Sequence, residues 1–111
     1  MHIQKFTQTM DARILLGKIL QRFQDRGRAQ VEGYKSFGYI RETNNAVWVS
    51  RESGKDTPVA FSKILIGIEA YQENPELYEL GPNELREFGI THVNSPVWAL
   101  LHLLKKEELQ K

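Results

Sequence analysis

The chain has 111 residues, of which 41% are hydrophobic and 26% charged, a composition typical of one globular domain with its own core. It contains no cysteine, which excludes disulfides, thiolate catalysis and Cys-ligated zinc. No apolar run reaches the roughly 18 residues of a transmembrane helix, and the first eight residues lack the apolar core of a signal peptide. We therefore expect a single cytoplasmic domain over residues 1–111 that does not enter a membrane.

The formal net charge of +1 conceals an uneven distribution of charge along the chain. Residues 1–63 carry eleven lysines and arginines against six acids, a net charge of +5. Residues 64–111 carry four basic residues against eight glutamates, a net charge of −4. This asymmetry suggests one basic face, which suits a nucleic acid or an acidic protein as partner. The alternative is a solvated surface without a binding role.

The first predicted element is a helix over residues 10–26. Its apolar residues recur at helical spacing, and Gly27 is suited to end it. Lys18, Arg22 and Arg26 follow one another at steps of four residues and therefore form a basic ridge on the polar face. The helix dipole explains a basic residue at the C-terminal end, but it does not explain Lys18.

A three-stranded antiparallel meander is predicted between Gln30 and Phe61. β-Favouring residues alternate with polar ones in this region, Asn44-Asn45 forms the first turn, and Ser53-Gly54 forms the second. Pro58 lacks an amide donor, which places the third strand at an edge of the sheet.

The middle strand, Ala46 to Glu52, contains the most informative aromatic residue of the meander. Its alternation puts Val47 and Val49 on one face and Trp48 on the other. Trp48 is either a contact residue for a partner or a part of the core, and the sequence leaves both interpretations open.

Three helices are predicted after the meander and are expected to pack on one of its faces. They cover residues 62–73, 82–88 and 95–106, with Lys105 and Lys106 at the C-terminal end of the last helix. Ser62 and Ser95 are the expected N-caps, and Gly67 inside the first of these helices indicates close packing. Residues 107–111 are expected to fray. The predicted fold is therefore α+β: an N-terminal helix, a three-stranded meander and three C-terminal helices.

The last two of these helices loosely resemble a helix-turn-helix. Their turn is about two residues longer than the usual three to four. In addition, the six acids from Glu69 to Glu87 are accompanied only by Arg86, and such a surface repels DNA. The favoured interpretation is a helical hairpin that closes the core.

The leading functional prediction is a small non-enzymatic protein that binds nucleic acid through a basic face. Residues of the first helix and the hairpins would contact phosphates, while Trp48 or Tyr39 would stack on a base. Alternatively, both aromatic residues form cross-strand pairs or core contacts. The predicted phosphate-contacting residues are Lys18, Arg22, Arg26, Arg41, Arg51 and Lys55, and Arg28 is a further candidate.

The alternative function is a protein-interaction or regulatory module, such as a homodimer or a subunit of a larger bacterial or phage assembly. The oppositely charged halves of the chain can meet head to tail or across a dimer axis. Trp48, Tyr78 and Trp98 would then be anchors in the interface.

The sequence predicts no enzyme, no cofactor and no metal site. No nucleophile or orienting acid is placed beside His92, and the histidines are not spaced as metal ligands. Lys55 in the Ser53-Gly54 turn lacks the two-glycine frame of a phosphate-binding loop. His102, within Leu-Leu-His-Leu-Leu, is expected at a helix surface or at the edge of the core.

A resemblance to a known class of modules covers roughly residues 38–104. The Ser53–Lys55 turn and the Pro58-Val59 strand are followed by a helix, by Gly-Pro-x-Glu-Leu-Arg at residues 81–86 and by Ser-Pro-x-Trp-Ala-Leu-Leu at residues 95–101. This order is similar to small modules appended to bacterial restriction-type nucleases. The resemblance implies an accessory module in DNA metabolism or defence, and it transfers no catalytic residue because the chain has no nuclease domain.

Overall fold

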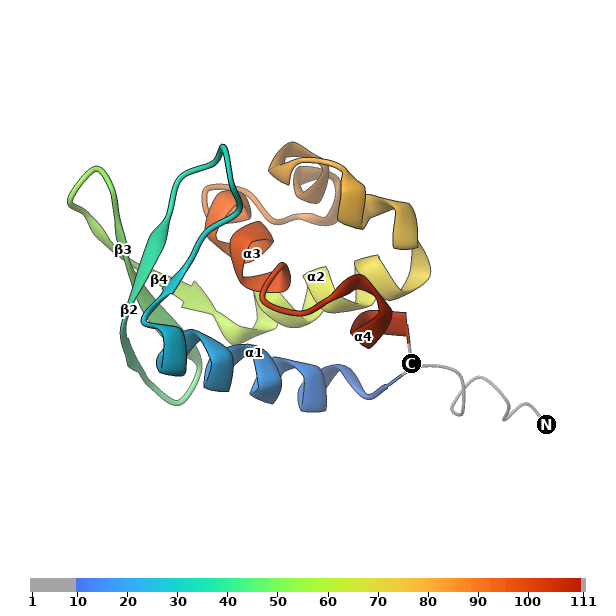
Figure 1. Cartoon of the computed structure of the whole chain (residues 1–111), viewed down its shortest axis with the longest axis horizontal. Helices are drawn as coiled ribbons and strands as arrows, with labels where there is room; N and C mark the ends of the chain where they lie inside the picture. Colours follow the sequence, from blue (N-terminus) through green and yellow to red (C-terminus); the bar gives the residue numbers. More distant parts are fainter. Residues whose placement is uncertain (1–9, 111) are drawn as a thin grey trace.

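A four-stranded antiparallel sheet forms one layer of the protein, and helices form the other (Figure 1). The computed structural model describes residues 10–110, and its strands follow one another across the sheet in chain order. The predicted α+β class is confirmed. The strands are β1 (Arg28–Ala29), β2 (Phe37–Glu42), β3 (Ala46–Arg51) and β4 (Asp56–Ala60).

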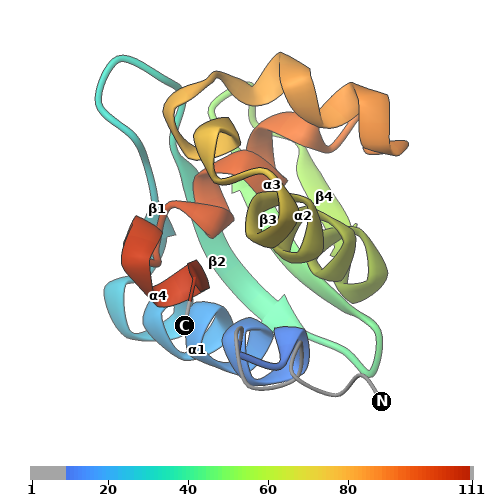
Figure 2. The same ribbon diagram turned by 90° about the vertical axis from the view of Figure 1, so that its right-hand side faces the viewer.

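The helices lie on one side of the sheet, which Figure 2 shows behind them. The Asp11 side chain caps the first helix by accepting a hydrogen bond from the Arg13 backbone N–H at 2.8 Å, and Gly27 ends that helix with a φ of 79°. The α-helices are α1 (Ala12–Arg26), α2 (Phe61–Glu73), α3 (Asn94–Leu101) and α4 (Lys106–Gln110), and the 3₁₀ helices are η2 (Pro75–Glu79) and η3 (Pro82–Phe88).

The sheet has four strands where the sequence predicts three, because β1 adds a short strand beside β2. Arg28 pairs with Gly38 in this added ladder. The left-handed turn at Gly27 directs the chain along β2, and the Gly27 carbonyl accepts a hydrogen bond from the Tyr39 N–H at 2.9 Å. A strand of two residues is too short to show an alternating pattern, which is why the sequence does not reveal it.

The turns and the edge of the meander lie where the sequence predicts them. The chain reverses at Asn44-Asn45 between β2 and β3, and again between β3 and β4, where Gly54 has a φ of 92°. β4, which contains Pro58, is an edge strand of the sheet. No strand pairs with the free edge of β4, so the missing amide of this proline costs no interstrand hydrogen bond on that edge.

The starts of α2 and α3 differ from the predicted serine caps. α2 begins at Phe61 immediately after β4, and the Phe61 N–H donates a hydrogen bond to the Asn45 carbonyl at 2.8 Å. This bond ties the beginning of the helix to the first hairpin turn. α3 begins at Asn94, and neither helix has a side-chain hydrogen bond at its N-cap. The assignments of Ser62 and Ser95 as N-caps are therefore wrong.

The end of the chain is also more ordered than predicted. Residues 106–110, most of which were expected to fray, form α4, and Leu109 on this helix is completely buried. The buried leucine supplies the apolar contact that holds so short a helix in place. Lys111 and the first nine residues, including those that underlie the expectation of a cytoplasmic protein, lie outside the described part of the chain.

The core lies between the inner face of the sheet and the helices. Gly67 lets α2 approach α3 closely, because a Cβ atom at this position would lie 3.0 Å from Leu101 Cδ1 and 3.3 Å from Val97 Cγ1. The close packing predicted at Gly67 is therefore confirmed. Side chains with no exposed surface include Val47, Val49, Val59, Leu15, Ile19, Phe23, Ile64, Ile68, Val97, Leu100 and Leu101.

α3 belongs to this core along almost its whole length. Every residue of α3 except Ser95 is buried. A helix that reads DNA must present side chains to the major groove, which a buried helix cannot do. The burial of α3 agrees with the part of the favoured interpretation in which this helix closes the core. None of the helices in residues 10–110 has the length and apolarity needed to cross a membrane.

Candidate nucleic-acid interface

The outer face of the sheet is the side turned away from the helices, and no element of residues 10–110 covers it (Figure 1). Successive residues of a strand point to opposite faces, so the buried Val47 and Val49 define the inner face and Trp48 and Ser50 the outer one. Pairing across the sheet forms two outer rows. One contains Arg41, Trp48 and Pro58, and the other Arg28, Gly38, Ser50 and Asp56.

Arg41 reaches the outer face because of an irregularity in β2. Tyr39 pairs with Val49, but the next pair joins Arg41 to Trp48, so Ile40 is an extra residue in the ladder. Such a bulge changes the face to which the following side chains point. The guanidinium carbon of Arg41 consequently lies 4.8 Å from the centroid of the Trp48 ring. This is a cation–π contact on a partly exposed indole.

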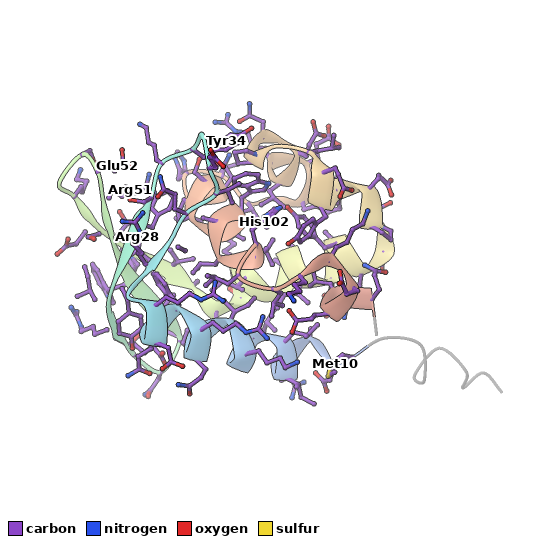
Figure 3. The ribbon with its side chains drawn as sticks, in the orientation of Figure 1. Met10, Arg28, Tyr34, Arg51, Glu52 and His102 are labelled. Atoms are coloured by element: carbon purple, nitrogen blue, oxygen red, sulfur yellow. The ribbon has the colours of Figure 1, made fainter. Side chains whose placement is uncertain are left out.

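A hollow lies on the Ser50 row at Gly38, which has no side chain to fill it. Its volume is about 280 Å³, and Arg28, Ser50 and Glu52 are among its walls. A Cβ atom at position 38 would lie 2.5 Å from Ser50 Oγ, so a glycine keeps the hollow open. Arg28 and Glu52 bring opposite charges to it, and both are exposed (Figure 3).

Tyr39 lies on the other face and does not join Trp48. Its ring meets Phe23 of α1 edge to face, with 5.3 Å between the ring centroids. Its hydroxyl donates a hydrogen bond to Glu42 Oε2 at 3.2 Å. Desolvation raises the pKa of Tyr39, and the Glu42 carboxylate adds to that rise. Of the two predicted stacking residues, the structure places only Trp48 on the uncovered face.

Two residues of the basic ridge on α1 contact the C-terminal helix. Arg22 donates hydrogen bonds to both carboxylate oxygens of Glu108, at 2.8 and 2.7 Å, and to the Leu103 carbonyl at 2.9 Å. Lys18 Nζ lies 3.6 Å from the same carboxylate. The hydrogen bond to Arg22 is the main cause that lowers the pKa of Glu108 to about 2, and the pKa of Arg22 is raised correspondingly.

The other predicted basic residues occupy separate places. Arg26 is exposed at the end of α1, and Lys55 is exposed in the β3–β4 turn. Arg51, on the inner face, donates hydrogen bonds to Thr57 Oγ1 and to the His92 carbonyl, both at 2.9 Å. The structure thus divides the six predicted residues among separate locations. Arg41 is the one of them that lies on the uncovered face, and Arg28 joins it there.

Tyr78 and Trp98, two of the three alternative anchors, and His102 make contacts within the fold. Trp98 Nε1 donates a hydrogen bond to the Leu80 carbonyl at 2.9 Å, and the Tyr78 hydroxyl donates one to the Leu104 carbonyl at 2.6 Å. His102 packs between these two rings, with centroid distances of 4.2 Å to Tyr78 and 4.5 Å to Trp98. Its nitrogens lie 2.8 and 2.9 Å from backbone carbonyl oxygens, so His102 is at the edge of the core.

The described residues show no cluster of side chains arranged for catalysis or for metal binding. His92 is exposed, and it lines neither the hollow at Gly38 nor the cavities beside Phe37. Within residues 10–110, no three His, Asp or Glu side chains are grouped to hold a metal ion. The arrangement that remains is a cation over an aromatic ring on an open sheet face. No protein-family model matches the chain, and comparison with curated proteins and with solved structures likewise gives no match.

Proposed function

We propose that the protein binds single-stranded nucleic acid on the outer face of its sheet, without catalysing a reaction. The observation that supports this most is the Arg41 guanidinium 4.8 Å from the Trp48 ring on an uncovered face. Planar aromatic and guanidinium groups stack with unpaired bases irrespective of sequence. The bases of a duplex are already stacked on each other, so a single strand is the better partner for this platform.

Arg28 supplies the second contact. It lies on the Ser50 row, two residues along the strand direction and two strands across from Trp48, which corresponds to a separation of roughly 12 Å between their Cα atoms. A base on Trp48 and Arg41 can therefore have a neighbouring phosphate beside Arg28. Asp56 and Glu52 at the same end of the face limit the positive charge, so we expect modest affinity.

The test is the affinity of the full chain for a short fluorescein-labelled oligothymidylate, measured by fluorescence anisotropy. Replacing Trp48 with alanine should weaken binding by roughly 5- to 150-fold, the usual contribution of one base–aromatic stack. One phosphate contact, to Arg28, predicts a slope of log K against log salt of about −0.7. Unchanged affinity in Trp48→Ala, or binding that is independent of salt, would refute the proposal.

A matched control separates local contacts from net charge. Arg13→Ala removes the same charge as Arg41→Ala, but Arg13 is exposed near the start of α1, away from the sheet (Figure 1). We expect Arg41→Ala to weaken binding much more than Arg13→Ala. Equal losses would mean that only overall charge matters. A salt-sensitive dimer in light scattering, together with no oligonucleotide binding, would instead support the protein-interaction module.

The nucleic-acid proposal agrees with the resemblance of residues 38–104 to accessory modules of restriction-type nucleases, which stays a prediction. The proposal differs from the prediction made from the sequence in its surface: it uses Arg28, Arg41 and Trp48, and it does not need Lys18 or Arg22, which contact Glu108.

A further inference from the structure

A cleft lies between the segment of residues 33–37, which leads into β2, and the start of α3. It consists of two cavities of about 290 and 170 Å³. Lys35, Phe37 and Ser95 line both cavities, so the cavities adjoin each other. We call this continuous space the 33–37 cleft. Tyr34 at its rim lies on the side of the molecule where the segment approaches the α3 region (Figure 3).

The larger end of the 33–37 cleft is walled by flat apolar groups. Tyr34, Phe37, Pro82 and Trp98 line it. The rings of Tyr34 and Trp98 lie 4.5 Å apart between centroids, with 56° between their planes. The hydrogen bond from Trp98 Nε1 to the Leu80 carbonyl fixes the indole, whereas the Tyr34 side chain is 48% exposed. A planar ring is the kind of group that such walls accept.

The smaller end of the cleft is positively charged. Lys35 and Arg51 line it together with Glu52, two cations against one acid. The ion pairs among residues 10–110 involve other basic residues, so the charges of Lys35 and Arg51 are not neutralised in this way. The Glu52 carboxylate accepts a hydrogen bond from the Ser36 N–H at 2.8 Å and thereby holds the segment to the end of β3.

Arg51 is held in position by acceptors that carry no charge. Its Nε donates to the Thr57 hydroxyl and one terminal nitrogen to the His92 carbonyl. Neutral acceptors orient the guanidinium and leave its full charge available to an anion. The cleft thus combines an aromatic end with an anion-attracting end.

We propose that the 33–37 cleft binds one nucleotide, with the base in the aromatic end and the phosphate between Lys35 and Arg51. The inference rests on the proposed function for the source of the nucleotide. Arg51 and Glu52 also line the hollow on the outer face, so a strand that crosses Trp48 and Arg28 can continue into the cleft. A free mononucleotide has the same chemistry, and the experiment distinguishes the two sources.

The test is an NMR titration of the ¹⁵N-labelled full chain with thymidine 5′-monophosphate, thymidine and inorganic phosphate. Thymidine 5′-monophosphate should shift the amides of Tyr34, Lys35 and Ser95. Thymidine and phosphate, which each offer half of the contacts, should bind at least about tenfold more weakly. No shift at these amides, or equal shifts with phosphate alone, would overturn the inference.

Lys35→Ala provides the decisive variant, because Lys35 is exposed and its loss does not disturb the core. We expect about tenfold weaker binding of the mononucleotide. Lys105→Ala, at another exposed lysine outside the cleft, should leave the affinity unchanged. Equal effects of the two variants would contradict a site at Lys35.

The outcomes for the cleft and the sheet face are separable. If Lys35→Ala also weakens the oligothymidylate complex, the strand itself enters the cleft; if it leaves that complex unchanged, the cleft binds free nucleotides. Oligothymidylate binding without any mononucleotide shift would overturn the cleft inference and leave the proposed function intact. Mononucleotide binding without oligothymidylate binding would overturn the proposed function and leave the cleft inference intact.

Discussion

Arg22 of α1 and Glu108 of α4, 86 residues apart in the chain, form a two-point hydrogen-bonded ion pair. Arg22 also donates to the Leu103 carbonyl, and the Lys105 N–H donates to Glu108 Oε1 at 2.7 Å. The pair therefore connects the first helix to the turn before the last one. It gives Arg22, and Lys18 beside it, a role within the fold.

The Arg22–Glu108 pair makes stability depend on pH. The carboxyl pKa of Glu108 falls from 4.5 to about 2 in the folded protein, mainly through the hydrogen bond from Arg22. A carboxylate with a lowered folded-state pKa stabilises the fold above its unfolded pKa, and this contribution disappears as the pH falls towards 2. We expect a loss on the order of 2 kcal/mol between about pH 5 and pH 2.

Urea unfolding of the wild type and of Glu108→Gln across that pH range measures this contribution. The glutamine keeps the size of the side chain and removes the ionisation. The variant should be less stable than the wild type at neutral pH, and the difference should shrink as the solution is acidified. A difference that is constant with pH would contradict the assigned role of the pair.

Replacing a helical glycine with alanine should have opposite effects on stability at Gly17 and at Gly67. Gly17 on α1 is exposed, and a methyl group added there would meet no atom of another element within 4 Å, so Gly17→Ala should raise the free energy of unfolding by up to about 1 kcal/mol. Gly67→Ala places its methyl 3.0 Å from the buried Leu101 and should lower stability by about 1 kcal/mol or more. Denaturant unfolding of both variants checks the signs, and stabilisation by Gly67→Ala would contradict the tight α2–α3 contact.

Tyr71 should tolerate the loss of its hydroxyl. The side chain is 1% exposed, and its hydroxyl has no hydrogen-bond partner among residues 10–110. Burial raises the pKa of this phenol, as expected for a group that cannot be solvated. An unpaired buried hydroxyl destabilises the fold. Tyr71→Phe should therefore leave the free energy of unfolding unchanged or raise it by up to about 1 kcal/mol, and the melting temperature should stay the same or rise accordingly. A marked fall in the melting temperature would show that the hydroxyl has a partner.

His92 has a φ of 62°, the one positive value among the non-glycine residues described. This backbone conformation occurs at the residue whose carbonyl accepts a hydrogen bond from Arg51. His92→Gly should change the free energy of unfolding by less than about 0.5 kcal/mol, since relief of strain offsets the added freedom of the unfolded chain. His92→Val should cost about 1–2 kcal/mol, because a β-branched residue resists positive φ. Thermal melts compare the two, and equal effects would contradict the prediction.

Local sequence chemistry predicts most of the fold. Gly27 and Gly54 mark chain reversals because they adopt positive φ, and Asn74-Pro75 ends α2 where a proline must. The paired valines of β3 identify the inner face of the sheet. These features depend on residues close together in the chain, which is why the pattern is sufficient to find them.

The features that the sequence does not reveal depend on pairing between distant segments. The extra residue at Ile40 turns Arg41 onto Trp48, but nothing in the composition of β2 marks a bulge. The partner of Arg22 lies in a helix that was expected to fray, so the ridge on α1 resembles a free surface. The hollow at Gly38 exists only once β1 and β3 lie on either side of β2.

The most direct test of the proposed binding face is an NMR titration of the full chain with oligothymidylate. The side-chain indole N–H of Trp48 and the amides of Arg28, Gly38 and Arg41 should shift together, with saturation at one common affinity. The amides of Lys18 and Arg22, which lie on α1, should remain unchanged. Shifts confined to α1, or no shift of the Trp48 indole at saturating oligonucleotide, would contradict the assignment of the outer sheet face as the nucleic-acid interface.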